Sequence, residues 1–179
     1  ASRHYPDGEC TLALFLGGEP LLHKRLFEFV SLARSRKLAV NLATNATLLS
    51  PERVDQLLSA PPNLLIVSFD GYDKESYERA RVGADFESTL EKVRHLVREK
   101  KRRNLREPLV RLYSLILHTD RSQEERKKYI SFYRREFRRV GFDEILIREA
   151  DDWAGLFEGT AGEVFHPDER KGTIFHPCP

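Results

Sequence analysis

Residues 14–23 form the part of this sequence best suited to holding a ligand. They read Leu-Phe-Leu-Gly-Gly-Glu-Pro-Leu-Leu-His, an apolar run followed by two glycines, a carboxylate and a proline. Gly17 and Gly18 lack a Cβ atom, so a bound molecule can approach their backbone N–H and C=O groups closely. Glu19 follows at the end of an expected strand, where its carboxylate can accept hydrogen bonds from a cationic group. Pro20 suits the first position of a helix, and the stretch therefore predicts a ligand cradle.

Two further polar groups follow apolar runs later in the sequence. Thr44 and Asn45 begin the segment Thr-Asn-Ala-Thr, and Ser68 and Asp70 belong to the segment Ser-Phe-Asp-Gly. Each segment alone is typical of an ordinary turn with side-chain caps. The carboxyl ends of successive parallel strands lie on one rim, however, so we expect all three polar groups to meet in one cleft.

The elements that must position these groups alternate along the chain. Apolar strand-like runs occur at 11–16, 38–43, 64–69, 109–117 and 144–148. Between them, apolar residues at helical spacing predict helices at 20–36, 50–60, 85–101 and 122–140. This alternation predicts an α/β fold with a parallel sheet. After residue 150 the periodicity ends, and 151–179 is expected to be a loop-rich connector.

Composition narrows the class of protein. The chain has 179 residues, 40% of them hydrophobic, and 30 Lys and Arg against 28 Asp and Glu. A net charge of +2 does not indicate a nucleic-acid or anionic-membrane partner. No apolar run reaches the roughly 18 residues of a membrane span, and no signal peptide is present at the start, so we expect a cytoplasmic protein. The chain begins with Ala1 and contains no Met, which suggests an excerpt of a longer protein.

With these motifs in this order, residues 11–155 resemble the radical S-adenosylmethionine enzymes, in the branch that carries a cysteine-rich SPASM or twitch extension. The resemblance implies a parallel, partial (β/α)6 TIM-like barrel, with the first βα unit missing from this chain. It also implies that 1–150 is the core barrel and that 151–179 leads to an auxiliary-cluster domain.

The resemblance assigns roles to the polar groups of the rim. It implies that the Gly-Gly-Glu-Pro element holds the amino group of the methionine moiety of S-adenosylmethionine, and that Ser68 faces the ribose or the methionine group. In Thr44-Asn45-Ala46, an alanine stands where the family usually has Gly. The implied cofactor-binding residues are Gly17, Gly18, Glu19, Pro20, Thr44, Asn45, Ser68, Asp70 and Arg81.

Arg81 is the expected partner of the cofactor carboxylate, with Arg79 as the alternative. In the family, an arginine often follows the Ser-Leu-Asp-Gly element in this position. A guanidinium suits the task because its planar fork can bind both oxygens of a carboxylate.

The largest departure from the family concerns its iron–sulfur cluster. The CxxxCxxC loop that binds the 4Fe–4S cluster is absent, and two distant cysteines, Cys10 and Cys178, cannot replace it. Either the loop lies upstream of residue 1, or this is a degenerate barrel that has abandoned the chemistry. The first alternative is favoured because the cofactor-facing residues are intact.

Cys178 resembles the cysteine that opens the family's C-terminal extension, and would then be a ligand of an auxiliary 4Fe–4S cluster. The alternative is a lone cysteine without a role. His166 and His176 could join it around zinc, but three ligands on a tail match structural zinc sites poorly.

The resemblance implies an enzyme in which the cluster reduces S-adenosylmethionine to a 5′-deoxyadenosyl radical that abstracts hydrogen from a substrate. It implies a peptide, protein or small-molecule substrate and an electron donor such as flavodoxin or ferredoxin, with no nucleic-acid or membrane partner. No residue stands out as a general acid, base or nucleophile. The alternative is a non-catalytic barrel that binds S-adenosylmethionine or acts as a partner domain. A phosphate-binding barrel is disfavoured because no Gly-rich loop with a phosphate-binding Lys occurs.

Overall fold

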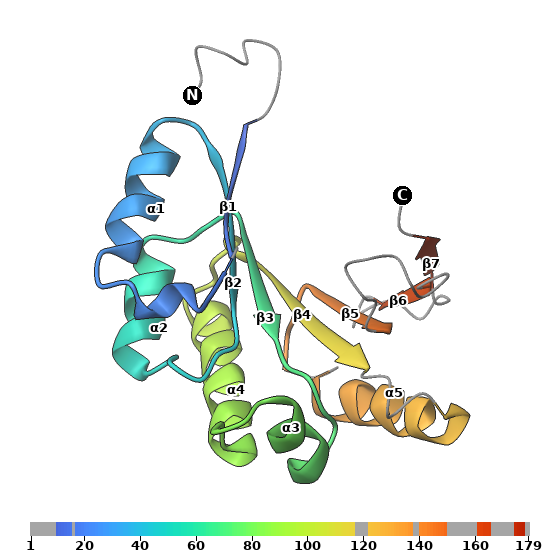
Figure 1. Ribbon diagram of the computed structural model, residues 1–179. Helices are drawn as coiled ribbons and strands as arrows, with labels where there is room; N and C mark the ends of the chain where they lie inside the picture. Colours follow the sequence, from blue (N-terminus) through green and yellow to red (C-terminus); the bar gives the residue numbers. More distant parts are fainter. Residues whose placement is uncertain are drawn as a thin grey trace.

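A computed structural model describes residues 10–15, 17–116, 122–137 and 140–149, together with the backbone of two short strands at 161–165 and 174–177. These residues contain one seven-stranded sheet in which the strands are ordered as they occur in the sequence (Figure 1). The strands are β1 (Thr11–Leu14), β2 (Ala39–Thr44), β3 (Leu64–Ser68), β4 (Leu109–Ile116), β5 (Glu144–Glu149), β6 (Ala161–Phe165) and β7 (Ile174–Pro177).

The first five strands are parallel, as the sequence predicted for 11–148. β6 pairs antiparallel with β5, and β7 antiparallel with β6. These last two strands lie in the segment 151–179, where the sequence analysis predicted only a loop-rich connector. The division of the chain at residue 150 stays a prediction.

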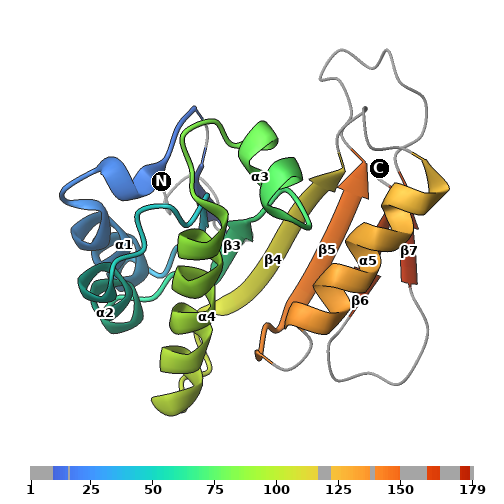
Figure 2. The same ribbon diagram turned by 90° about the horizontal axis from the view of Figure 1, so that it is seen from below.

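Each connection between neighbouring parallel strands contains helix. The helices are η1 (Pro20–Leu22), α1 (Leu26–Ser35), α2 (Pro51–Ser59), α3 (Lys74–Ala80), α4 (Phe86–Arg102) and α5 (Gln123–Phe137). Figure 2 shows α4 and α5 lying against the same face of the curved sheet. None of the helices in the described ranges is long and apolar enough to cross a membrane.

Burial alternates along the central strands, as expected when one face of a sheet packs against helices. In β2 and β3 the residues Val40, Leu42, Leu65 and Val67 are fully buried in the core, and their neighbours along each strand are only partly buried. The helices therefore cover one face, and the opposite face is left for the inner side of a barrel. This arrangement is the predicted partial TIM-like α/β fold.

Local sequence signals account for the helix boundaries. Ser50 caps α2 by accepting a hydrogen bond from the Arg53 N–H at 3.3 Å, and Asp85 caps α4 by accepting from the Ser88 N–H at 2.7 Å. α3 was not predicted from the sequence, although Asp73 and Ser76 form a reciprocal capping box at its start.

The helix predicted over 20–36 is divided in two. Glu19 caps η1 through the Leu21 N–H at 3.1 Å, and His23 then leaves helical geometry with φ −77° and ψ 120°. The His23 ring accepts a hydrogen bond from the Arg25 N–H at 3.2 Å, which satisfies a donor at the start of α1. The spacing of apolar residues does not reveal this break, because the break is stabilised by hydrogen bonds of two polar side chains, Glu19 and His23.

An aromatic cluster packs the end of β3 against three helices. Phe69 lies at its centre, with ring centroids 4.5 Å from Tyr77 of α3, 5.7 Å from Phe86 of α4 and 5.9 Å from Phe137 of α5. Phe69 is fully buried. The backbone on either side of it, at Ser68 and Asp70, is therefore anchored to the core at the rim of the sheet.

Candidate functional site

A pocket of about 390 Å³ opens at the carboxyl ends of β1, β2 and β3. Its lining residues are Phe15, Gly18, Glu19, Ala43, Thr44, Asn45, Ser68 and Arg81. The structure thus brings together residues from all three polar groups that the sequence placed on one rim. Asp70 is not among the lining residues.

Sequence reasoning missed Phe15 and Ala43. Phe15 directly follows β1 and is 40% exposed, and Ala43 belongs to the partly buried face of β2. The alternation of buried and less buried residues along β2 could have pointed to Ala43, since residues two apart share one face of a strand.

Glu19 joins the loops that follow β1 and β2. Its Oε1 accepts hydrogen bonds from the Thr44 hydroxyl at 2.8 Å and from the Leu21 N–H at 3.1 Å, and its Oε2 accepts from the Asn45 N–H at 2.8 Å. From the sequence, this carboxylate is expected to accept from a cationic ligand group. Its oxygens together offer about four acceptor positions, so three protein donors leave room for one ligand donor on Oε2.

The loop after β2 is fixed by its own side chains. Asn45 Oδ1 accepts from the N–H and the hydroxyl of Thr47, at 3.0 and 2.7 Å. This use of the amide oxygen sets the orientation of Asn45 and leaves its NH₂ group as the donor on the pocket. Ala46 adopts a left-handed φ of 63°, which accounts for the Gly that the family usually has at this position.

Ser68 and Arg81 form the opposite side of the pocket. Ser68 ends β3 and is half-buried. Arg81 is the C-terminal cap of α3, and its side chain is 28% exposed. Its Nη2 lies 2.5 Å from Asp70 Oδ2. Asp70, which is 7% exposed, pairs with Arg81 but does not itself line the pocket.

A tyrosine of α5 fixes the backbone on both sides of Asp70. The Tyr133 hydroxyl is within hydrogen-bond distance of the carbonyls of Phe69 and Gly71, and it also contacts Ser114 Oγ at 2.7 Å. Burial raises the pKa of Tyr133 well above its ordinary value of 10.0. The phenol is therefore protonated at neutral pH, and its single O–H can donate to either of these carbonyls.

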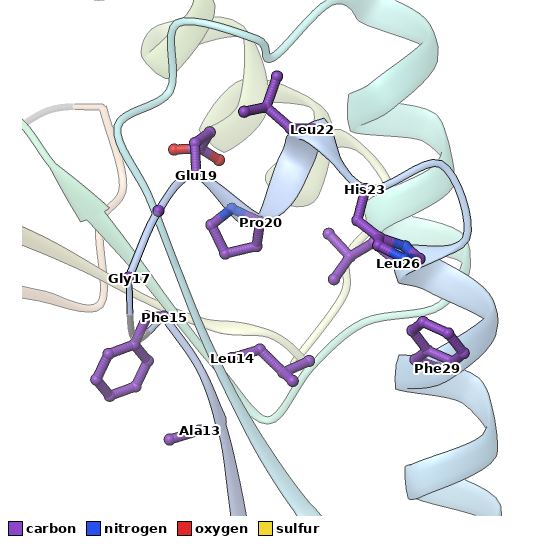
Figure 3. Close-up of a pocket in the computed structure, with 11 residues that line it drawn as sticks. Ala13, Leu14, Phe15, Gly17, Glu19, Pro20, Leu22, His23, Leu26 and Phe29 are labelled. Atoms are coloured by element: carbon purple, nitrogen blue, oxygen red, sulfur yellow. The ribbon is translucent and has the colours of Figure 1, made fainter.

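Gly17 and Pro20 line a neighbouring pocket of about 460 Å³, which also touches Gly18 and Glu19. Figure 3 shows this pocket between the end of β1 and the start of α1, with His23 and Phe29 on one side. The backbone φ is 80° at Gly17 and 147° at Gly18, and a Cβ atom built on either residue would meet nothing within 4 Å. Open space therefore borders both glycines, and their role in holding a ligand stays a prediction.

The pocket at the rim suits a ligand that carries both an amino group and a carboxylate. Glu19 offers a carboxylate oxygen on one side and Arg81 a guanidinium on the other, with the Asn45 amide and the Ser68 hydroxyl also on the lining. The methionine moiety of S-adenosylmethionine has this pair of charged groups, so the residues present fit that cofactor.

The chain does not fit the iron–sulfur cluster. Its sequence has two cysteines, Cys10 before β1 and Cys178, which lies outside the described residues together with His166. Three thiolates near one another cannot be assembled from them. His176 lies in β7, where only the backbone is described, so the auxiliary-cluster and zinc alternatives stay predictions.

Comparison with known protein families now identifies the class of protein. Residues 2–133 match the model of the Radical SAM superfamily. The match covers more than half of the chain, which therefore belongs to this superfamily, as the sequence motifs predicted.

The curated relatives include two enzymes with different names. The chain is 36% identical over 94 residues to an AdoMet-dependent heme synthase of Methanosarcina barkeri, covering 50% of this chain and 27% of the relative. It is 32% identical over 85 residues to a PqqA peptide cyclase of Granulibacter bethesdensis, covering 48% of this chain and 23% of the relative. The chain thus spans about a quarter of the length of these relatives.

Solved structures share the fold. TYW1 with a lysine-pyruvate adduct bound superposes with a TM-score of 0.59 at 18% identity, over 80% of this chain and 43% of TYW1. SuiB of Streptococcus suis bound to S-adenosylmethionine gives a TM-score of 0.56 at 14% identity, over 81% of this chain and 30% of SuiB. At these identities the likeness confirms the α/β barrel-type fold alone.

Proposed function

We propose that this chain supplies the S-adenosylmethionine-binding face of a radical S-adenosylmethionine enzyme. The observation that carries the proposal is the pocket at the rim of β1, β2 and β3, where Glu19 and Arg81 present opposite charges. The bound cofactor, given one electron by an iron–sulfur cluster held by thiolates that this sequence does not contain, supplies methionine and a 5′-deoxyadenosyl radical.

The residues of this chain bind and orient the cofactor. Glu19 Oε2 accepts from the amino group of the methionine moiety, beside the bond that it already accepts from the Asn45 N–H. Arg81 holds the carboxylate, and Asn45 and Ser68 offer a donor and a hydroxyl between these two charges. Gly17 and Gly18 leave room for the cofactor to approach the backbone. No side chain of the pocket is assigned a proton-transfer role.

A peptide is the proposed substrate, from which the radical abstracts hydrogen. Two of the proteins compared support it: one is named a PqqA peptide cyclase, and SuiB has been solved bound to its precursor peptide. A small-molecule substrate is the alternative, since another relative is a heme synthase. An electron donor of the flavodoxin or ferredoxin type completes the proposal.

Calorimetric titration of the complete protein with S-adenosylmethionine tests the binding site. Ser68→Ala and Arg81→Ala each remove a hydrogen-bonding group from the pocket. A hydrogen bond to a charged group contributes about 1.5–3 kcal/mol, so each variant should lose roughly tenfold or more in affinity. Arg79→Ala tests the alternative partner and serves as the control: Arg79 lies in the last turn of α3, two residues before Arg81, but does not line the pocket, so its loss should leave the affinity unchanged. Unchanged affinity in both pocket variants would contradict the proposed site.

A second measurement tests the chemistry. After anaerobic reconstitution with iron and sulfide, the complete protein should be brown and should release 5′-deoxyadenosine from S-adenosylmethionine when a reductant is added. If it binds S-adenosylmethionine but takes up no iron and releases no 5′-deoxyadenosine, the enzyme proposal fails. The non-catalytic binding barrel then takes its place.

A further inference from the structure

Asp70 was expected from the sequence to bind the cofactor, but its surroundings indicate a different role. The residue is 7% exposed, and both of its carboxylate oxygens have protein partners. Oδ1 accepts a hydrogen bond from the Leu115 N–H of β4 at 2.8 Å, and Oδ2 lies 2.5 Å from Arg81 Nη2. The carboxylate therefore links the ends of β3, β4 and α3.

The position of this carboxylate is fixed from several sides. The Tyr133 hydroxyl contacts the carbonyls of the two residues that flank Asp70, Phe69 and Gly71. Gly71 packs so closely against α3 that a Cβ atom on it would lie 2.5 Å from the Tyr77 backbone. Asp70 is thus a fixed point against which the long Arg81 side chain is held.

Arg81 is held at its backbone as well as at its side chain. Its N–H donates to the Tyr77 carbonyl at 2.8 Å, and its carbonyl accepts from the Ala84 N–H at 3.0 Å. The guanidinium has five N–H donors, and the bond to Asp70, a residue that does not line the pocket, uses one of them. Arg81 lines the pocket and 28% of its side chain is exposed, so its remaining N–H donors can receive a second carboxylate.

We propose that Asp70 is a positioning residue that aims the Arg81 guanidinium at the carboxylate of the bound ligand. The inference rests on the proposed function, because it takes that ligand to be S-adenosylmethionine. An unrestrained arginine loses side-chain freedom when it binds a ligand, and a side chain already held in place loses less. Asp70 therefore acts on affinity through Arg81 without touching the ligand.

The test compares two ligands on the complete protein. S-Adenosylmethionine has the carboxylate, whereas 5′-methylthioadenosine has the nucleoside and the sulfur but neither the carboxylate nor the amino group. Asp70→Asn keeps the shape of the side chain and removes its charge. We expect this variant to bind S-adenosylmethionine about tenfold more weakly and 5′-methylthioadenosine as well as the wild type does. The double variant, Asp70→Asn with Arg81→Ala, should lose no more affinity for S-adenosylmethionine than Arg81→Ala alone, because both substitutions act on the contact between Arg81 and the ligand carboxylate.

Asp85→Ala is the matched control for a purely structural effect. Asp85 is also a loop carboxylate close to α3, but it caps α4 through the Ser88 N–H and pairs with Lys74 rather than with Arg81. The Asp85→Ala variant should have a lower thermal stability, but the ratio of its affinities for S-adenosylmethionine and 5′-methylthioadenosine should be unchanged. If Asp70→Asn does not fold, Asp70→Glu takes its place, because the longer side chain displaces the guanidinium while keeping the charge pair.

Each outcome decides something. The positioning role would be overturned if a folded Asp70 variant lost the same affinity for both ligands, or lost affinity for neither. Additive losses in the double variant would also overturn it. A wild-type protein that binds 5′-methylthioadenosine but not S-adenosylmethionine would instead contradict the proposed function itself, before any variant is considered.

Discussion

The Thr44 hydroxyl donates a hydrogen bond to Glu19 Oε1 at 2.8 Å, and this bond joins the loop after β1 to the last residue of β2. The two residues lie 25 positions apart in the sequence. Thr44 is 2% exposed, so the bond is sheltered from water at its Thr44 end. Glu19 is therefore part of the architecture of the rim as well as a candidate ligand of the cofactor.

The first prediction concerns this bond. Thr44→Val keeps the shape of the side chain but removes an oxygen that donates to Glu19 and accepts from the Ala46 N–H at 3.0 Å. Leaving buried partners unsatisfied costs about 1–3 kcal/mol. We expect a loss of this size in the free energy of unfolding, measured by urea denaturation.

Thr47→Val is its matched control. The Thr47 hydroxyl also donates within this loop, to Asn45 Oδ1 at 2.7 Å, but Asn45 Oδ1 keeps the bond from the Thr47 N–H. The control should therefore lose less stability than Thr44→Val. Equal losses in the two variants would show that the bond between Thr44 and Glu19 has no special importance.

The second prediction concerns the close contact between Gly71 and α3. In Gly71→Ala, the new Cβ atom would lie 2.5 Å from the N and Cα atoms of Tyr77, and these are backbone atoms that cannot rotate away. The residue also has a φ of 142°, which L-residues rarely adopt. Overpacking and backbone strain each cost about 1–3 kcal/mol, so we expect the free energy of unfolding to fall by about 2–6 kcal/mol, measured by urea denaturation.

Gly83→Ala separates the two causes. Gly83 has a φ of 84°, but a Cβ atom there would meet nothing within 4 Å. Only the backbone cost of about 1–2 kcal/mol is expected. The steric argument is wrong if Gly71→Ala destabilises the protein no more than Gly83→Ala does.

Much of the fold follows from the sequence because it depends on apolar periodicity. The five parallel strands, α2 and α4 have long alternating or helical apolar patterns, and all were predicted close to their observed bounds. The features that the sequence did not predict depend on hydrogen bonds of polar side chains or on the pairing of short strands. The break at His23, the capping box of α3 and the antiparallel strands β6 and β7 have no such apolar pattern.

The site was predictable in its location but not in the direction of each side chain. The topology of a parallel sheet alone brings Glu19, Thr44 and Ser68 to one rim. Whether Asp70 faces the pocket or the protein depends on the Leu115 N–H and on Arg81, which are 45 and 11 positions away. Such contacts are set by tertiary packing, and no local motif encodes them.

The third prediction concerns acid stability. Glu136 of α5 has hydrogen bonds from Arg135 and from Arg94 of α4, and these hold its pKa below the ordinary value of 4.5. A carboxylate whose pKa is lower in the folded than in the unfolded state stabilises the fold at pH values above the unfolded pKa. That stabilisation is lost as the pH falls through the folded pKa. Glu136→Gln should therefore lower stability at pH 7, by about 1 kcal/mol, and have a smaller effect well below pH 4.5.

Urea denaturation of both proteins across this pH range is the measurement. Glu124→Gln serves as the control, because its side chain is 82% exposed and its ion pair with Lys128 is 3.6 Å long. The control should change stability little at either pH. A difference between wild type and Glu136→Gln that stays constant or grows on acidification would contradict the predicted sign.

The last prediction concerns the end of α1. The Lys37 N–H donates to the Arg34 carbonyl at 2.9 Å and the Leu38 N–H to the Ala33 carbonyl at 3.1 Å, which is the pairing of a Schellman motif. Lys37 has a left-handed φ of 59° and is exposed. Glycine removes the Cβ cost of this conformation, about 1–2 kcal/mol, and the lost charge near the helix C-terminus offsets about 0.3–1 kcal/mol of that gain.

Lys37→Gly should therefore raise the free energy of unfolding by about 0.5–1 kcal/mol, measured by urea denaturation. Lys37→Ala is the control, since it removes the charge and keeps the Cβ atom, and it should not stabilise the protein. Asn104 occupies the equivalent position after α4, with a φ of 52°. Asparagine tolerates this conformation better than lysine does, so Asn104→Gly should gain less than Lys37→Gly. If Lys37→Ala stabilises the protein as much as Lys37→Gly, the gain comes from the lost charge and the conformational argument is wrong.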